Sequence, residues 1–165
     1  MEPRPPEPEP ETAQSPEDIQ ALLEELSDHA VVFHGYTDYG RDYEVVFYEV
    51  DDPASGVDPF LVRCLFKQCV VAEVETALSA AVWRESLDET VSGRRWQRNH
   101  PGVTAVYESE RTQGWTKRIG IPFSEAGIET DAHRITLVFS ELVVIRHRGE
   151  YVPYRLVPDP PDRRG

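Results

Sequence analysis

The sequence contains little of what membrane proteins, secreted proteins and phosphate-binding enzymes require. Its 165 residues include only two cysteines, one methionine and ten glycines. No apolar run approaches the roughly 20 residues of a membrane-spanning helix, and the N-terminus lacks the basic start and apolar middle of a signal peptide. The glycine-rich motifs of nucleotide-binding loops, G-x-x-x-x-G-K-[ST] and G-x-G-x-x-G, do not occur. We therefore expect a cytoplasmic protein with no membrane partner.

The motifs of metal binding and nucleophilic catalysis are missing too. The five histidines have no HExxH spacing, no CxxC is present, and no serine stands in a G-x-S-x-G motif. If Cys64 and Cys69 share one strand, they lie about 16 Å apart on opposite faces, which is too far for a disulfide. We interpret both as reduced core thiols. The sequence predicts no metal, no cofactor and no catalytic residue, and it favours a protein that is not an enzyme.

Basic residues are scarce, and this bounds the possible partners. Seventeen Lys and Arg stand against thirty Asp and Glu, for a net charge of −13. Residues 16–83 alone hold fourteen acids and three bases. Such a charge repels nucleic acid and attracts basic proteins. One basic and aromatic segment, residues 94–100, is too short to outweigh it, so we expect a basic protein partner and no nucleic acid.

Composition divides the chain into three parts. Residues 1–15 are rich in Pro and Glu and are predicted to be disordered. Residues 16–157 are predicted to form a single domain, and residues 158–165 a loose C-terminal tail. Ser15 and Pro16 suit the N-cap and the first position of a helix, which apolar residues at helical spacing continue to about Asp28.

Hydrophobic periodicity predicts an α+β fold, with an antiparallel sheet of about five strands and two or three helices. Further helices are expected at residues 79–87 and 109–119, the second ending at Gly120. The apolar phase shifts after Ser140, which indicates a bulge. The expected extended segments are 31–33, 43–50, 60–78, 123–130 and 133–146.

The connection between the first two strands is the candidate site. Turns are normally built from small polar residues, whereas this one carries aromatic, acidic and basic groups. The candidate binding residues are His34, Tyr36, Asp38, Tyr39, Arg41, Asp42 and Glu44. If the loop folds back, carboxylates beside the His34 imidazole raise its pKa and make it a potential base. Alternatively, the acids pair with Arg41 or cap the turn, and the tyrosines pack at a sheet edge.

Several longer motifs resemble one protein family. They are FHGYTDYGRDYEVVFY (33–48), WRESLD (83–88), the W-Q-x3-P-G-x-T pattern of residues 96–104, ESER (108–111) and AHRITLVFSEL (132–142). Together they resemble the YxiG-like proteins of bacteria, mostly actinobacteria, over about residues 17–157. The resemblance implies no activity, cofactor or catalytic residue.

Three functions remain open at this point. The first, which we favour, is an acidic protein-binding module of the immunity or antitoxin type that docks on a basic partner. The second is a small enzyme or ligand-binding domain that uses the His34–Asp42 loop, with Tyr36 and Tyr39 as walls. The third is a module that self-associates through an exposed strand edge.

Overall fold

The fold is that of a computed structural model, which describes residues 8–26, 30–37, 40–49, 60–76, 102–130 and 133–148. The helix predicted at residues 79–87, the basic segment 94–100 and the C-terminal tail lie outside these residues. The described residues form nine strands in two antiparallel sheets and two helices. The α+β class and the antiparallel pairing are confirmed, and the sheet content is higher than expected.

The larger sheet has five strands in the order β1-β9-β4-β3-β2. The strand β3 lies inside the sheet, and residues 43, 45 and 47 point toward the core, as their alternation predicts. The strands are β1 (Glu11–Ala13), β2 (Ala30–Tyr36), β3 (Tyr43–Glu49), β4 (Phe60–Lys67) and β9 (Glu141–Arg148).

The smaller sheet has four strands in the order β5-β8-β7-β6. Its inner face supplies Ile128, Ile135 and Leu137 to the same core as the larger sheet. The strands are β5 (Val71–Thr76), β6 (Gly102–Tyr107), β7 (Ser124–Glu129) and β8 (His133–Phe139). The periodicity of the sequence did not reveal β6.

Both helices begin at serine caps. In α1 (Pro16–Glu24), the Ser15 hydroxyl accepts a hydrogen bond from the backbone N–H of Asp18 at 3.2 Å. In α3 (Glu110–Ile119), Ser109 and Thr112 satisfy each other's backbone N–H groups. The helix α3 ends at Gly120, whose φ of 89° is left-handed and is readily adopted by glycine. The predicted start of α1 and both predicted ends of α3 are confirmed.

The two sheets are joined by a bent ribbon of two long chain segments. Residues 60–67 pair with 141–148 in one sheet, and residues 71–76 pair with 133–138 in the other. Three residues, 68–70, stand opposite two, 139–140, at the bend, and Gln68 adopts a left-handed φ of 46°. A one-residue register shift is therefore present at the bend, but its extra residue lies within 68–70 and not after Ser140, where the bulge was predicted. The predictions of single strands over 60–78 and 133–146 are wrong, because each segment changes sheets here.

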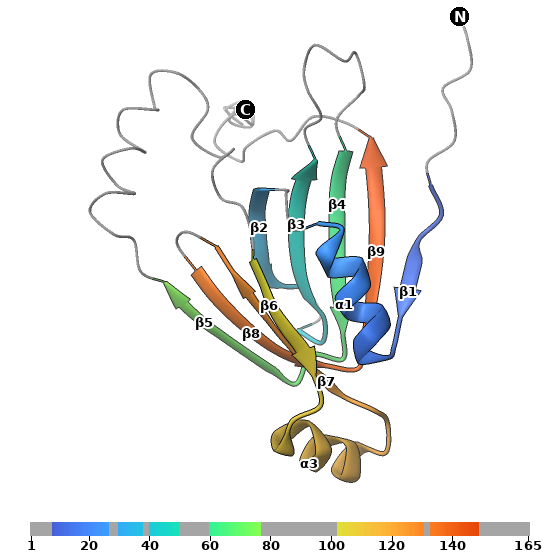
Figure 1. The fold of residues 1–165 in the computed structure, drawn as a ribbon, viewed down its shortest axis with the longest axis vertical. Helices are drawn as coiled ribbons and strands as arrows, with labels where there is room; N and C mark the ends of the chain where they lie inside the picture. Colours follow the sequence, from blue (N-terminus) through green and yellow to red (C-terminus); the bar gives the residue numbers. More distant parts are fainter. Residues whose placement is uncertain are drawn as a thin grey trace, which may run out of the picture.

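The core lies between the larger sheet and a layer made of the smaller sheet and α1. The helix α1 lies beside β6, and together they cover one face of the larger sheet (Figure 1). Ile19, Leu23 and Leu26 of this segment are buried in the shared core. The helix contacts β6, β1 and β9. The prediction of disorder through residue 15 is wrong for β1, which pairs with β9 and buries Ala13.

Phe66 tests the packing at the bend. Its ring meets that of Phe139 edge-to-face at 4.8 Å, and both side chains are fully buried. We expect Phe66→Leu to lower the free energy of unfolding by about 1–2 kcal/mol through lost contacts. The same change at the half-exposed Phe33 should cost less than about 0.5 kcal/mol. Urea denaturation measures both, and equal losses would contradict this packing.

Candidate functional site

The predicted loop between β2 and β3 is a tight turn closed by backbone hydrogen bonds. The N–H of Thr37 donates to the carbonyl of Asp42, and the N–H of Gly40 donates to the carbonyl of Thr37, both at 2.8 Å. Gly40 has a left-handed φ of 64°, which glycine adopts without strain. Two of the candidate residues, Asp38 and Tyr39, lie outside the described residues.

The two described acids of the candidate set are engaged within the protein. Asp42 accepts hydrogen bonds from Nζ of Lys67 at 2.6 Å and from the backbone N–H of Gln68 at 3.1 Å. Glu44 accepts from Nε of Arg63 at 2.7 Å. Asp42 therefore pairs with Lys67, and not with Arg41 as one alternative predicted. Asp42 thereby holds the loop against the bend of the ribbon, and Glu44 ties β3 to β4. These contacts weaken the case for both acids as a docking surface.

Arg41 contributes its backbone to the same contact. Its carbonyl accepts a hydrogen bond from the N–H of Cys69 at 2.7 Å, and its side chain is exposed. The side chain forms no ion pair with another described residue.

The described aromatic members of the candidate set, His34 and Tyr36, pack against Tyr43 of β3. Nδ1 of His34 lies 2.8 Å from the hydroxyl of Tyr43, and the rings of Tyr36 and Tyr43 meet edge-to-face at 5.2 Å. The Tyr36 hydroxyl donates to the carbonyl of Cys69 at 3.3 Å. Burial and the nearby Cys69 raise the pKa of Tyr36 to about 12, so this hydroxyl keeps its proton.

His34 faces a second histidine from a distant part of the sequence. The imidazole of His133, at the start of β8, lies 4.8 Å from that of His34 between ring centroids, at 69°. Burial, and then the proximity of His133, lower the pKa of His34. The conditional expectation of a raised pKa beside carboxylates is therefore wrong. No sequence signal links the pair, because they lie on strands of different sheets.

The two thiols are buried and free, as expected. Burial raises the pKa of Cys69 to about 11 and also raises that of Cys64. Because the thiolate is the reactive form, neither side chain is poised as a nucleophile. The described residues also contain no group of three or more His, Cys, Asp or Glu that could hold a metal ion.

A groove of about 500 Å³ lies at the inner corner of the bend. The start of α1, the ribbon bend and the chain on either side of α3 form its walls. The lining residues are Gln14, Ser15, Pro16, Gln68, Glu108, Ile121, Pro122, Ser124, Ser140 and Glu141. No pattern in the sequence marks any part of this groove as a site.

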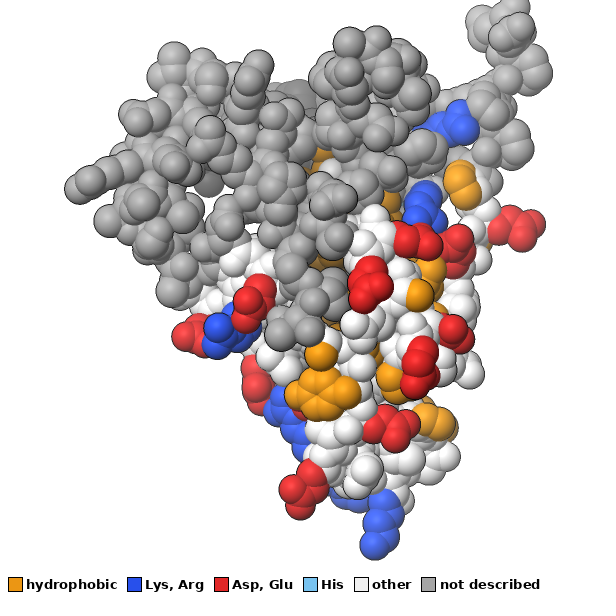
Figure 2. Space-filling model, viewed as in Figure 1, with side chains coloured by type: hydrophobic (Ala, Val, Ile, Leu, Met, Phe, Trp, Pro, Cys, Tyr) orange, Lys and Arg blue, Asp and Glu red, His pale blue; other side chains and the backbone are white. Residues whose placement is uncertain are grey.

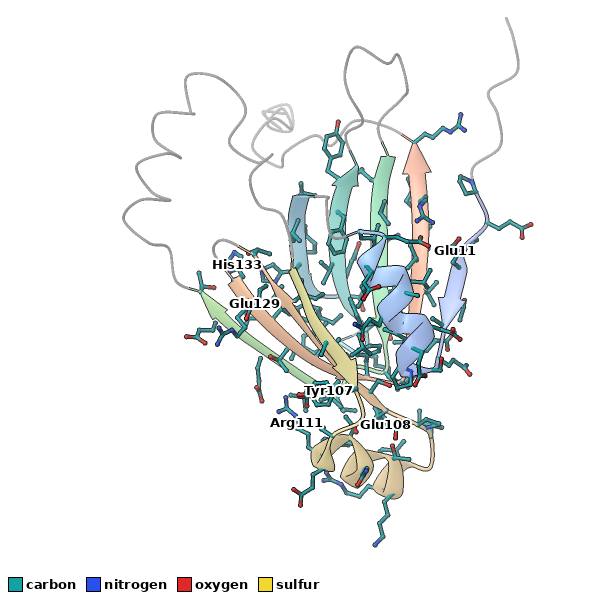
Figure 3. The ribbon with its side chains drawn as sticks, in the orientation of Figure 1. Glu11, Tyr107, Glu108, Arg111, Glu129 and His133 are labelled. Atoms are coloured by element: carbon teal, nitrogen blue, oxygen red, sulfur yellow. The ribbon has the colours of Figure 1, made fainter. Side chains whose placement is uncertain are left out.

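The groove is acidic. Glu108 and Glu141 line it, and Glu17 and Asp18 follow its lining residue Pro16 in the first turn of α1. Within the described parts of the chain, no basic side chain forms an ion pair with any of these four acids. Figure 2 shows acidic side chains spread over the face that carries α1, and Glu108 lies between α1 and α3 in Figure 3.

A buried carboxylate fastens α3 to the smaller sheet. Glu125, only 6% exposed, accepts hydrogen bonds from Tyr107, Arg111 and Ser109, and Arg111 also pairs with Glu73 at 2.7 Å. Burial alone would raise the pKa of Glu125, but the hydrogen bonds from Tyr107 and Arg111 outweigh it and lower the pKa. Because these hydrogen bonds join α3 to β6 and β7, we interpret the network as structural.

The described residues form a small antiparallel α+β domain with an acidic groove, and they contain no recognisable set of catalytic residues. The chain belongs to the YxiG-like protein family, whose model matches residues 15–157. No curated protein and no solved structure matches it significantly. Among the residues described, neither helix has the length and apolar character needed to span a membrane.

The structural role of Asp42 leads to a stability prediction. Asp42→Ala removes the hydrogen bonds to Lys67 and to the backbone of Gln68, so it should lower the free energy of unfolding by about 1–2 kcal/mol. Glu75→Gln, an acid-to-amide change at an exposed position of β5, serves as the control and should change it by less than about 0.5 kcal/mol. Chemical denaturation distinguishes them. An unchanged stability for Asp42→Ala would show that this acid is free for another role.

The Glu125 network leads to a pH prediction. A carboxyl group whose pKa is lower in the folded than in the unfolded state stabilises the fold above its unfolded pKa, and this contribution is lost as the pH falls through the folded pKa. The stability advantage of the wild type over Glu125→Gln should therefore shrink between about pH 6 and about pH 3. Denaturation at several pH values measures it. An advantage that grows on acidification would contradict the assignment.

Proposed function

We propose that the protein is a non-enzymatic protein-binding module that receives a basic side chain of its partner in the acidic groove. The main support is the set of four acids around the groove, Glu17, Asp18, Glu108 and Glu141, which lack ion-pair partners among the described residues. Asp42 and Glu44 carry the same charge but are already paired. We therefore place the proposed docking surface in the groove and not at the predicted loop.

The shape and lining of the groove suit an arginine or lysine side chain. Its volume of about 500 Å³ is large enough for such a side chain. Ile121 and Pro122 offer apolar surface to the methylene stem, while Glu108 and Glu141 are available to the charged head. An isolated surface ion pair contributes little free energy, so a recess that accepts both stem and head is better suited to specific binding.

The net charge of the chain supports the same class of partner. A charge of −13 accelerates the approach of a basic protein at low salt. Immunity and antitoxin proteins are the form of binding module that this charge favours. The proposal places the protein in the cytoplasm, where free thiols such as Cys64 and Cys69 persist.

The proposal is tested by capturing partners from a lysate of the source organism. The baits are the wild type, the groove variant Glu108→Gln/Glu141→Gln, and a matched control, Glu9→Gln/Glu75→Gln, which removes the same charge elsewhere. We expect a basic protein on the wild type and the control, and its loss from the groove variant. For the purified partner, the groove variant should lower the association rate by about tenfold at low salt.

Two results would contradict the proposal. One is a partner that the groove variant and the wild type bind equally well. The other is a partner lost equally from the groove variant and the control, which would mean that net charge acts without a defined site. Circular dichroism of the three proteins establishes that each is folded before the comparison is made.

A further inference from the structure

A second, independent site lies between the two sheets, at the paired histidines. A pocket of about 340 Å³ is lined by Val31, Val32, Phe33, His34, Thr130 and His133. We infer that this pocket binds a small organic anion, whose carboxylate or phosphate oxygens accept a hydrogen bond from Nε2 of His34 and lie beside the ring of His133. This inference is separate from the acidic groove and does not depend on it.

Each imidazole is anchored by a hydroxyl through one of its two nitrogens. Nδ1 of His34 lies 2.8 Å from the hydroxyl of Tyr43, and Nδ1 of His133 lies 2.8 Å from Oγ1 of Thr76. Neither Nε2 has a hydrogen-bond partner in the described part of the chain. The anchored nitrogens fix the orientation of both rings and leave Nε2 of each for a ligand.

The surroundings of Tyr43 determine which His34 nitrogen carries the proton. Tyr43 is buried, and burial and then the nearby Cys69 raise the pKa of its hydroxyl, so it stays protonated. Its only hydrogen-bond partner among the described residues is Nδ1 of His34. A buried hydroxyl left without an acceptor is costly, so this hydroxyl donates to Nδ1 and the His34 proton resides on Nε2. An N–H at Nε2 suits an anion, whereas a metal ion requires a lone pair there.

The shape of the pocket comes from an irregularity in β2. The pairing shifts between Val31 and Phe33, so Val32 is an extra residue opposite β3. A regular strand would send neighbouring side chains to opposite faces, but this bulge lets four consecutive residues line one pocket. Phe33 is 50% exposed and provides an apolar wall beside the polar end formed by the histidines. The ligand should therefore carry its charge on a small apolar body.

The charged groups around the pocket favour an anion as its ligand. Among the described residues that line the pocket, none is a carboxylate. Tyr43 on β3 and Thr76 on β5 are engaged with the imidazoles. Glu129 and Arg134, on β7 and β8 beside the pocket, pair with each other at 3.0 Å.

This environment gives the binding a defined pH dependence. Burial and His133 lower the pKa of His34 in the free protein. A bound anion raises that pKa by favouring the imidazolium. Binding should then be tighter at lower pH, because protonation and anion binding favour each other.

The test titrates the full chain with benzoate, phenyl phosphate and benzamide, using NMR shifts of the histidine side chains. Benzamide has the shape of benzoate without its charge. We expect at least one anion to bind with a Kd on the order of 1 mM, at least tenfold tighter than benzamide, and more tightly at pH 6 than at pH 8. Comparison of benzoate with phenyl phosphate tells which anionic group the pocket prefers.

Substitutions test whether the anion binds at His34. His34→Gln should weaken the preferred anion at least tenfold and remove the pH dependence, whereas His147→Gln, on β9, should do neither. Tyr43→Phe keeps the ring but should shift the His34 proton from Nε2 toward Nδ1, which nitrogen shifts report. The inference is overturned if the folded wild type binds neither anion, if benzamide binds equally well, or if His34→Gln binds like the wild type.

Discussion

The structure depends on the bend at which the ribbon of residues 60–76 and 133–148 passes from one sheet to the other. Three residues face two at this point, and the left-handed Gln68 accommodates the mismatch. Because the same two segments supply strands to both sheets, the bend sets how the sheets face each other across the core. Asp42 holds it from outside through Lys67 and the backbone of Gln68. The acidic groove lies at the same place, since Gln68, Ser140 and Glu141 form one of its walls.

The distribution of charge separates structural acids from available ones. Asp42, Glu44 and Glu125 each accept a hydrogen bond from a nearby base, and they hold the loop, β4 and α3 in place. The acids around the groove lack such partners among the described residues, and two of them, Glu108 and Glu141, line it together with Ile121 and Pro122. Exposed charges steer association, whereas pairs already made within the protein add little to it. This acidic chain thus contains structural acids and available acids, and only their contacts in the folded protein distinguish the two groups.

Local signals in the sequence predicted local structure well. Ser15, Pro16, Ser109 and Gly120 mark helix ends because capping depends on neighbouring residues. The phase shift after Ser140 was visible for the same reason. The break at Gln68 was not, because apolar residues continue on both sides of it and nothing in them tells one sheet from two.

The candidate site could be predicted only in part, because its important contacts join distant segments. The loop around His34 was correctly chosen as unusual, yet the partners of its side chains come from elsewhere. Lys67 reaches Asp42 from the ribbon, and His133 reaches His34 across the two sheets. Glu108 and Glu141 form one groove only after β6 and β9 are placed. No spacing in the sequence contains that information.

The central claim is that the groove, and not the loop or the net charge, recognises basic side chains. The most direct measurement is an NMR titration of the isotope-labelled protein with an amidated arginine-rich hexapeptide at low salt. The account predicts that the largest shifts fall on backbone amides of Gln14, Gln68, Glu108 and Ile121, which line the groove. Shifts centred on residues 40–44, or spread evenly over all exposed acids, would contradict it.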